Sequence, residues 1–287
     1  MTQMSGPQEF HYRLPRRVRG WRPGFHPGSD VGAGQEFVAH QRLFDWPDPR
    51  RLDLRASLQN LHGDWLVRVH RQRASVTVYA IVDVSASMQF GARASKLHLA
   101  ADFVEALGRS AGQIGDALGM LAFDAAERHD LFVPASLSRG IGTVMGGMLR
   151  DCAGAAGSVR GLQETALRLS GRSALVFIVS DFHWSLEGLG AVLDLLAQAY
   201  VVPIILWDRA EIRPPDANGL LAVRDAESGA QRTLWMRPGL RERWAAAVER
   251  RRDALERICQ AREIRPFYLD GALDCDALSQ YFLEASA

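Results

Sequence analysis

The pattern of apolar and polar positions changes at about residue 75, and from there short apolar runs alternate with amphipathic stretches. The apolar runs have the length of buried strands. Six of them are predicted strands: residues 76–82, 117–123, 130–133, 174–179, 201–207 and 265–269. The alternation therefore predicts a sheet whose strands are separated by helices.

Between these runs, apolar residues recur at every third or fourth position, as on one face of an amphipathic helix. The clearest example covers residues 96–114, and the longest extends from about residue 240 to 258. Further helices are predicted over residues 139–152, 162–169 and 273–282. Two short strands, 220–224 and 233–236, flank Glu227-Ser228-Gly229 and predict a β-hairpin insertion over about residues 219–237.

Buried strands that alternate with helices are typical of a mostly parallel sheet with both faces covered. We therefore predict an α/β fold for residues 75–287, with a doubly wound, mostly parallel six-stranded sheet. In such sheets ligands bind beyond the carboxyl ends of the strands, where the strand order reverses. Functional residues are expected at those ends.

Residues 1–74 have a different pattern, in which glycine and proline recur without helical periodicity. Such residues break helices and favour turns and short strands. Residues 65–70 alternate as a strand does. We predict an irregular, β-containing N-terminal extension that packs against the α/β domain, because it has no helical core of its own.

A dense charged motif, Arg50 to Ser57, lies within this extension. We hypothesise that Asp53 pairs with Arg50, Arg51 or Arg55 and pins the extension onto the α/β domain. A solvated charged loop is the alternative.

Composition limits the possible functions. The 34 basic and 33 acidic residues leave a formal net charge of +1, which favours neither nucleic acid nor a membrane surface as partner. The longest apolar run, residues 199–207, is too short to span a bilayer, and the first residues lack a signal-peptide core. Three cysteines without C-x-x-C spacing argue against disulfides or a zinc ribbon. The expected protein is globular and cytoplasmic.

The basic residues are unusual in kind, since 33 of the 34 are arginine and Lys96 is the only lysine. Arginine is the side chain that most often contacts guanine in nucleic-acid complexes. Because the arginines are spread along the whole chain, we interpret the bias as the codon usage of a GC-rich bacterial genome.

Short oxygen-bearing side chains follow two of the predicted strands. Asp83, Ser85 and Ser87 come directly after the strand 76–82, and Asp181 comes after the strand 174–179. Both ends emerge at the same edge of a parallel sheet. Hard oxygens at low total charge suit Mg²⁺, which keeps several of its waters. Helix capping by Asp83 and the serines is the structural alternative.

These residues carry a resemblance. Asp83-Val84-Ser85-Ala86-Ser87 resembles the metal-ion-dependent adhesion site of von Willebrand factor A-like domains, and Asp181 matches its second acidic position. More specifically, residues 30–285 resemble the bacterial domain-of-unknown-function 58 family, whose members accompany MoxR-type AAA+ ATPases. Five motifs match in order: residues 50–57, 82–88, 180–182, 208–211 and 224–229.

The resemblance implies a von Willebrand factor A-like fold with Mg²⁺ held by Asp83, Ser85, Ser87 and Asp181. Mn²⁺ or Ca²⁺ would be able to substitute. Such a site leaves one coordination position open for a carboxylate from another protein.

One part of the adhesion site is missing from the sequence. Its usual threonine belongs on a loop that corresponds to residues 157–161, and this loop contains none. Ser158 is the predicted replacement, and Thr143 is a second option. Arg160 lies at about the position of the threonine, and its guanidinium would oppose a cation. Weak Mg²⁺ binding is therefore predicted.

Two classes of function stay open. The first is a non-catalytic interaction module or adaptor that works with a MoxR-type AAA+ ATPase in the assembly, remodelling or maturation of a client protein complex, the client presenting an acidic side chain. The second is a divalent-metal-dependent, phosphatase-like hydrolase that uses Asp83 and Asp181. We favour the first, because no general base or nucleophile accompanies the acidic pair in the sequence.

Overall fold

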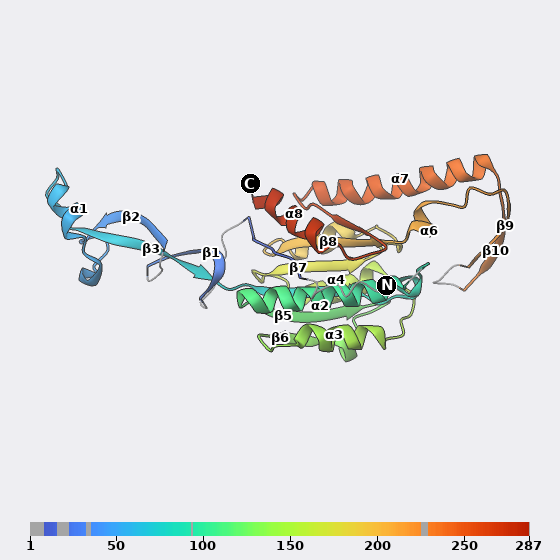
Figure 1. The fold of residues 1–287 in the computed structure, drawn as a ribbon, viewed down its shortest axis with the longest axis horizontal. Coiled ribbons are helices and arrows are strands. Elements are labelled where there is room, and N and C mark those ends of the chain that lie inside the picture. Colours follow the sequence, from blue (N-terminus) through green and yellow to red (C-terminus); the bar gives the residue numbers. More distant parts are fainter. Residues whose placement is uncertain (1–8, 16–22, 33–35, 93, 225–228, 287) are drawn as a thin grey trace, which may run out of the picture. The chain divides into compact units, whose positions relative to one another are not determined.

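The computed structural model describes residues 9–15, 23–32, 36–92, 94–224 and 229–286. Contacts divide the chain into two compact units (Figure 1). We call them the α/β unit, which takes in Met1–Tyr12 and Thr77–Glu284, and the small β unit, which takes in Arg13–Val76 with Ala285–Ala287. For the residues of the small β unit, the expected packing against the α/β domain stays a prediction.

A six-stranded sheet forms the centre of the α/β unit, in the order β11-β8-β7-β4-β5-β6. β6 is antiparallel to β5, and the other neighbours are parallel. The predicted α/β class and the six-stranded, mostly parallel sheet are confirmed. The strands are β4 (Thr77–Asp83), β5 (Ala117–Phe123), β6 (Val133–Ser136), β7 (Leu175–Ser180), β8 (Tyr200–Trp207) and β11 (Phe267–Asp270).

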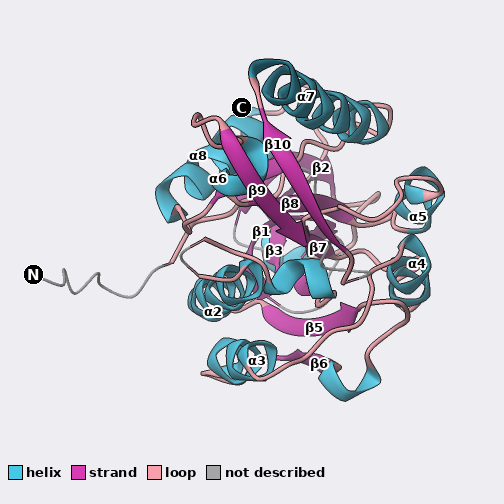
Figure 2. Cartoon of the chain, turned by 90° about the vertical axis from the view of Figure 1, so that its right-hand side faces the viewer, coloured by secondary structure: helices cyan, strands magenta, loops and turns pink. Residues whose placement is uncertain are grey.

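Helices cover both faces of this sheet, as a doubly wound fold requires. Figure 2 shows α2 (Lys96–Ile114) and α3 (Ile141–Arg150) on one side, and α4 (Val159–Leu167) and α5 (Leu189–Leu195) on the other. Two further helices, α7 (Pro238–Gln260) and α8 (Cys275–Ser286), lie in the last third of the chain. Among the described residues, no helix is both long and apolar enough to cross a bilayer.

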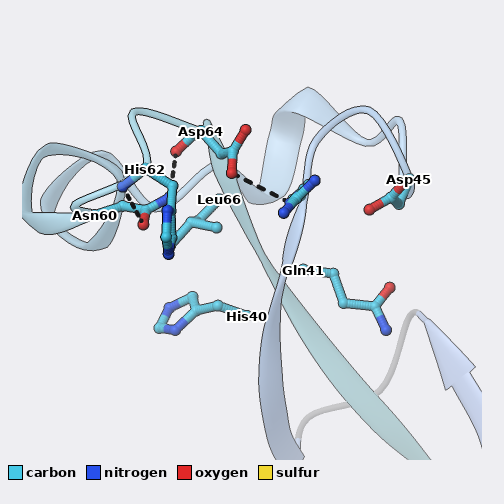
Figure 3. Close-up of a pocket in the computed structure, with 8 residues that line it drawn as sticks. His40, Gln41, Asp45, Asn60, His62, Asp64 and Leu66 are labelled. Carbon is cyan, nitrogen blue, oxygen red and sulfur yellow. Dashed lines mark hydrogen bonds and ion pairs between the residues drawn. The ribbon is translucent and has the colours of Figure 1, made fainter.

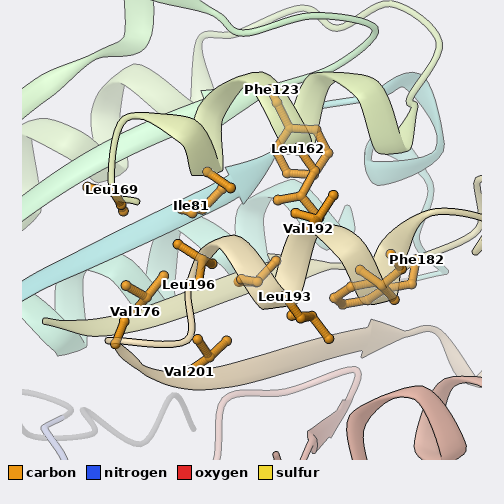
Figure 4. Close-up of a cluster of buried hydrophobic side chains, with 14 of the residues drawn as sticks. Ile81, Phe123, Leu162, Leu169, Val176, Phe182, Val192, Leu193, Leu196 and Val201 are labelled. Carbon is orange, nitrogen blue, oxygen red and sulfur yellow. The ribbon is translucent and has the colours of Figure 1, made fainter. Parts of the chain in front are cut away.

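Successive residues of β7 point to opposite faces and build two separate apolar layers. Val176 and Ile178 join a buried cluster with Leu162 of α4 and Val192 of α5 (Figure 4). Phe177, between them in sequence, packs on the other face. This two-sided burial explains why β7 is apolar at every position.

On the face of the sheet that Phe177 occupies, Phe10 from near the N-terminus completes the apolar layer. Phe10 is 2% exposed and stacks on Phe103 of α2, with a ring-centroid distance of 5.8 Å. It also lies against Phe177 and against Phe282 of α8. The backbone N–H of Phe10 donates to Ser110 Oγ over 2.9 Å. Phe10 and Tyr12, both buried, are therefore part of the α/β core.

Several predicted boundaries differ from the observed ones. The strand predicted over residues 130–133 is replaced by a 3-10 turn, His129–Leu131, followed by β6. The short helices α5 and α6 (Arg209–Ile212) were not predicted. The predicted hairpin is present as β9 (Gly219–Arg224) and β10 (Gln231–Met236), which pair antiparallel. Residues 225–228 of its turn lie outside the described part of the chain.

The small β unit is a three-stranded antiparallel sheet in the order β1-β3-β2. Its strands are β1 (Pro23–Gly32), β2 (Glu36–Arg42) and β3 (Leu66–Ala74). A 3-10 turn, Pro49–Arg51, and the short helix α1 (Leu54–Gln59) connect β2 to β3. The extension predicted as irregular and β-containing thus contains a sheet, and the pairings of β3 with both neighbours include register shifts.

Asp53 organises the charged motif of this unit, but with a partner outside the motif. Its Oδ1 caps α1 by accepting from the Ala56 N–H, and its Oδ2 accepts from Arg68 Nε over 2.7 Å and lies 3.0 Å from His40 Nε2. The hydrogen bond from Arg68 is the main reason that the pKa of Asp53 is well below its usual range. The hypothesis of a pair with Arg50, Arg51 or Arg55 is therefore wrong, because β3 brings Arg68 closer.

Candidate functional site

The candidate site lies at the carboxyl ends of β4 and β7, which are neighbours in the sheet. From β4 the chain continues to β5 on one side, whereas β7, β8 and β11 follow in turn on the other side. The strand order therefore reverses between β4 and β7, at the position where α/β sheets bind ligands. Asp83 is the last residue of β4, and Asp181 follows β7 directly.

Asp83 is fully buried and surrounded by hydrogen-bond donors. Its Oδ1 accepts from the Ser85 N–H over 2.9 Å. Its Oδ2 accepts both from Ser180 Oγ over 2.6 Å and from the indole Nε1 of Trp184 over 2.9 Å. Burial, and secondly the nearby charge of Asp181, raise the pKa of Asp83 to about 6. The three donors hold the carboxylate in one orientation.

The two serines of the motif lie together beside Asp83. Ser85 Oγ and Ser87 Oγ are 3.2 Å apart, and both side chains are buried. The segment 153–157 covers them, because the Ala86 N–H donates to Ala155 O over 2.8 Å. A Cβ at Gly154 would lie 1.5 Å from the carbonyl oxygen of Val84, so only glycine allows this close approach.

Asp181 is also buried, and its charge is compensated by Lys96. The Lys96 ammonium lies 2.6 Å from Asp181 Oδ2 and 2.7 Å from Glu211 Oε1, while the His183 N–H donates to Asp181 Oδ1 over 3.0 Å. Burial alone would raise the pKa of Asp181, but His183 and Lys96 outweigh it and lower the pKa. Removing one partner of such a buried pair typically costs about 3–5 kcal/mol.

Lys96 belongs to the candidate site, and sequence reasoning missed it. It is the first residue of α2, after the N-cap Ser95, and its side chain is 3% exposed. Its carboxylate partners, Asp181 and Glu211, are 85 and 115 positions further along the chain, so no local sequence motif indicates them. The signal in the sequence is that Lys96 is the only lysine among 34 basic residues. Interpreting the arginine bias as codon usage left this exception unexplained.

Further side chains extend the site toward α6 and α7. His183 stacks on Trp207, and its Nε2 lies 3.6 Å from Glu211 Oε2. Arg251 of α7 donates to the carbonyl oxygens of Phe182 and Trp184. Burial lowers the pKa of the Arg251 guanidinium, whereas the charge of Asp181 raises it.

The residues proposed to replace the missing threonine lie elsewhere. Ser158 caps α4, since its Oγ accepts from the Gly161 N–H over 3.2 Å and donates to Ala125 O. Thr143 is exposed in α3. The side chain of Arg160 is 81% exposed and pairs with Glu164, so its guanidinium does not enter the site. The cation near the carboxylates is the Lys96 ammonium instead.

We tested whether the predicted ligands suit a divalent cation. All four carboxylate oxygens of Asp83 and Asp181 accept hydrogen bonds from the protein, and Asp83 Oδ2 accepts two. The ammonium of Lys96 is already in contact with Asp181. The residues therefore do not fit Mg²⁺ in this arrangement, and metal binding by Asp83, Ser85, Ser87 and Asp181 stays a prediction of the sequence.

A cavity of about 250 Å³ lies beside Lys96, between the start of α2 and the ends of β8 and β11. Ser95, Trp207, Asp208 and Leu273 are among its lining residues. Asp208 caps α6 and also accepts from the Ala92 N–H over 2.9 Å. Lys96 therefore adjoins this cavity, although its side chain is only 3% exposed.

The small β unit has a separate, mostly polar cavity of about 450 Å³ (Figure 3). Several of its lining residues interact with one another. Asp64 forms an ion pair with Arg42 over 3.2 Å, and Asn60 Nδ2 donates to the backbone carbonyl of Asp64. We assign no ligand to it. Its lining residues are His40, Gln41, Arg42, Asp45, Asn60, His62, Asp64 and Leu66.

Comparison with known proteins agrees with the resemblance to the domain-of-unknown-function 58 family. Residues 48–254 match the family described as "Protein of unknown function DUF58". The chain belongs to the DUF58 family. This DUF58 protein is 28% identical over 258 residues to the uncharacterized protein Rv1480 of Mycobacterium tuberculosis, an alignment that covers 88% of this chain and 78% of the relative.

A second relative carries information about gene context. An uncharacterized protein of Paracoccus denitrificans, named for its place in the moxR 3' region, is 33% identical over 92 residues, covering 32% of this chain and 88% of its own. Among solved structures, BatB from Bacteroides thetaiotaomicron aligns with a TM-score of 0.43 at 15% identity, covering 74% of this chain and 99% of that one.

Proposed function

We propose that this DUF58 protein is a non-catalytic interaction module that works with a MoxR-type AAA+ ATPase on a client protein complex. The construction of the strand-end site carries the proposal. Asp83 and Asp181 are buried and engaged by donors of the protein itself, an arrangement that suits a rigid docking surface better than a reacting group. The relative named for the moxR 3' region supports the choice of partner.

The buried network fixes a rim of exposed residues around it. Gln89 and Phe90 follow the serine motif, Ala155 and Ala156 belong to the covering segment, and His183 follows Asp181. This mixture of polar and apolar groups on a fixed backbone is suited to a protein partner, since binding then orders few side chains. An acidic side chain on the client stays a prediction.

We also propose that the α/β unit is a von Willebrand factor A-like domain. The D-x-S-x-S motif follows the central strand β4, and Asp181 follows its neighbour β7, as the resemblance implies. The alternative of a metal-dependent hydrolase stays a prediction. A phosphatase assay on the purified protein, with and without Mg²⁺, tests it.

A binding experiment between the purified protein and a MoxR-type ATPase of the same genome tests the interaction. We expect Ala156→Asp to weaken binding, because it places a charge on the exposed covering segment. Ser173→Asp is the matched control, since Ser173 is exposed at the opposite end of the sheet, before β7. Equal affinity of the two variants would exclude the strand-end surface.

The small β unit offers a second surface for the same partner. Its exposed apolar side chains include Phe44, Leu58 and Leu61, with exposed fractions of 95%, 82% and 99%. Apolar groups this exposed often mark interaction sites. If Ala156→Asp leaves binding unchanged and Leu58→Asp abolishes it, this second surface is the docking site.

A further inference from the structure

The strand-end site gathers more negative charge than its sequence motif shows. Asp181 is buried and Glu211 of α6 is 22% exposed, and one ammonium group contacts both. Asp83, on the adjacent strand, is close enough for the charge of Asp181 to raise its pKa. Three carboxyl groups therefore share a site, and Lys96 makes direct ion pairs with two of them.

We propose that the ammonium of Lys96 permanently supplies the positive charge that a divalent cation would supply at this position, so that the site works without metal. The distances of 2.6 Å and 2.7 Å are those of charge-assisted hydrogen bonds. A divalent ion at Asp181 would have to share these oxygens with a like charge. The inference concerns the same surface as the proposed function, but it does not depend on the identity of the partner.

The position of Lys96 along α2 supports this role. It is the first residue of the helix, next to the positive end of the helix dipole, where a cation is unfavourable. Helix stability therefore does not explain a buried lysine there. The two carboxylates do, because they offset both the dipole and the cost of burial.

The chemical identity of the residue supports it as well. The chain uses arginine at 33 of its 34 basic positions, and the exception is this buried one. An ammonium is a compact point charge with three donors, whereas a guanidinium is a planar fork of five. Two donors of Lys96 face Asp181 and Glu211, and Nζ lies 5.8 Å from the ring centroid of Phe90. A compact charge suits this enclosed position.

Removing the ammonium should create a metal site from the groups that it now neutralises. Asp181, His183 and Glu211 offer ligand atoms that all lie within 4.8 Å of one another. Two carboxylates and an imidazole are ligands for Mn²⁺ or Zn²⁺. A cavity of about 30 Å³ adjoins these groups, and His183 and Glu211 are among its lining residues.

Thermal unfolding with and without divalent ions tests the proposal. For the wild type we expect the same Tm in millimolar Mg²⁺, in millimolar Mn²⁺ and in chelator. For Lys96→Ala we expect a lower Tm in chelator and a rise of about 5 °C with Mn²⁺ at a hundred times its Kd. Arg128→Ala is the control, since it also frees two carboxylates, Asp124 and Asp130, which do not belong to the group formed by Asp181, His183 and Glu211.

Isothermal calorimetry on the wild type keeps the proposal testable even if Lys96→Ala does not fold. Absence of Mg²⁺ and Mn²⁺ binding supports it. Stoichiometric binding that is lost in Asp181→Asn overturns it, and so does a folded Lys96→Ala that gains no response to Mn²⁺. These outcomes are independent of the ATPase: loss of ATPase binding would refute the adaptor function and leave the metal result unaffected.

Discussion

Replacing Asp83 by asparagine separates two opposing effects at the centre of the site. Burial and the charge of Asp181 raise the pKa of Asp83 from 3.8 to about 6. A difference of about two units corresponds to about 3 kcal/mol, at about 1.4 kcal/mol per unit. This is the free energy by which ionised Asp83 destabilises the fold at neutral pH. Asp83→Asn removes that cost.

The substitution also disturbs the hydrogen bonds. One carboxylate oxygen accepts from the Ser85 N–H and the other accepts from Trp184 Nε1, and both partners are donors. Whichever way the asparagine is turned, its NH₂ group faces one of them. A buried donor left without an acceptor costs about 1–3 kcal/mol. The two effects nearly cancel at neutral pH, so the difference in stability between variant and wild type should be small there.

The dependence on pH is therefore the informative quantity. Because the pKa is higher in the folded state than in the unfolded state, the stability that protonated Asp83 provides is fully present below its unfolded pKa of 3.8 and is lost as the pH rises through about 6. From about pH 4 to about pH 7, the wild type should lose up to about 3 kcal/mol relative to Asp83→Asn. Urea unfolding of both proteins across this range measures it. A constant difference between the two curves would refute the reasoning.

Three other substitutions probe separate parts of the account. Gly154→Ala should lower the free energy of unfolding by about 1–3 kcal/mol or more, because its Cβ would overlap the Val84 carbonyl. Gly147→Ala is the control and should not lower it, because a Cβ there meets open space in α3. Urea unfolding of both variants measures the difference. Phe10→Ala should cost about 3–5 kcal/mol, since the ring fills the core beside α2, and an unchanged Tm would contradict that packing. Asp53→Ala should accelerate amide hydrogen exchange in α1, which loses its cap; unaltered exchange there would show that the cap is dispensable.

Local pattern was sufficient to predict most of the sheet and its helices. The helix over residues 96–114 and the strand over 117–123 have the bounds that apolar periodicity indicated. The prediction failed where elements are short or partly exposed. β6 has four residues with none fully buried, and α6 has only four residues, so neither has enough periodicity to be located.

The site was predicted in part, and the reason for the missing part is distance along the chain. Asp83, Ser85 and Ser87 are neighbours in sequence, and the strand pattern places Asp181 beside them. Lys96 reaches Asp181 and Glu211 only because the fold brings α2, β7 and α6 together. The capping role of Ser158 was not predicted, because the helix was expected to begin at residue 162 and begins at Val159 instead.

Hydrogen exchange of this protein, free and bound to a MoxR-type ATPase, tests the central claim most directly. If the strand-end surface docks the partner, protection should appear in residues 83–90, 153–157 and 181–185, the segments that form the rim of the buried network. Protection confined to the small β unit, or no protection at all, would contradict the account.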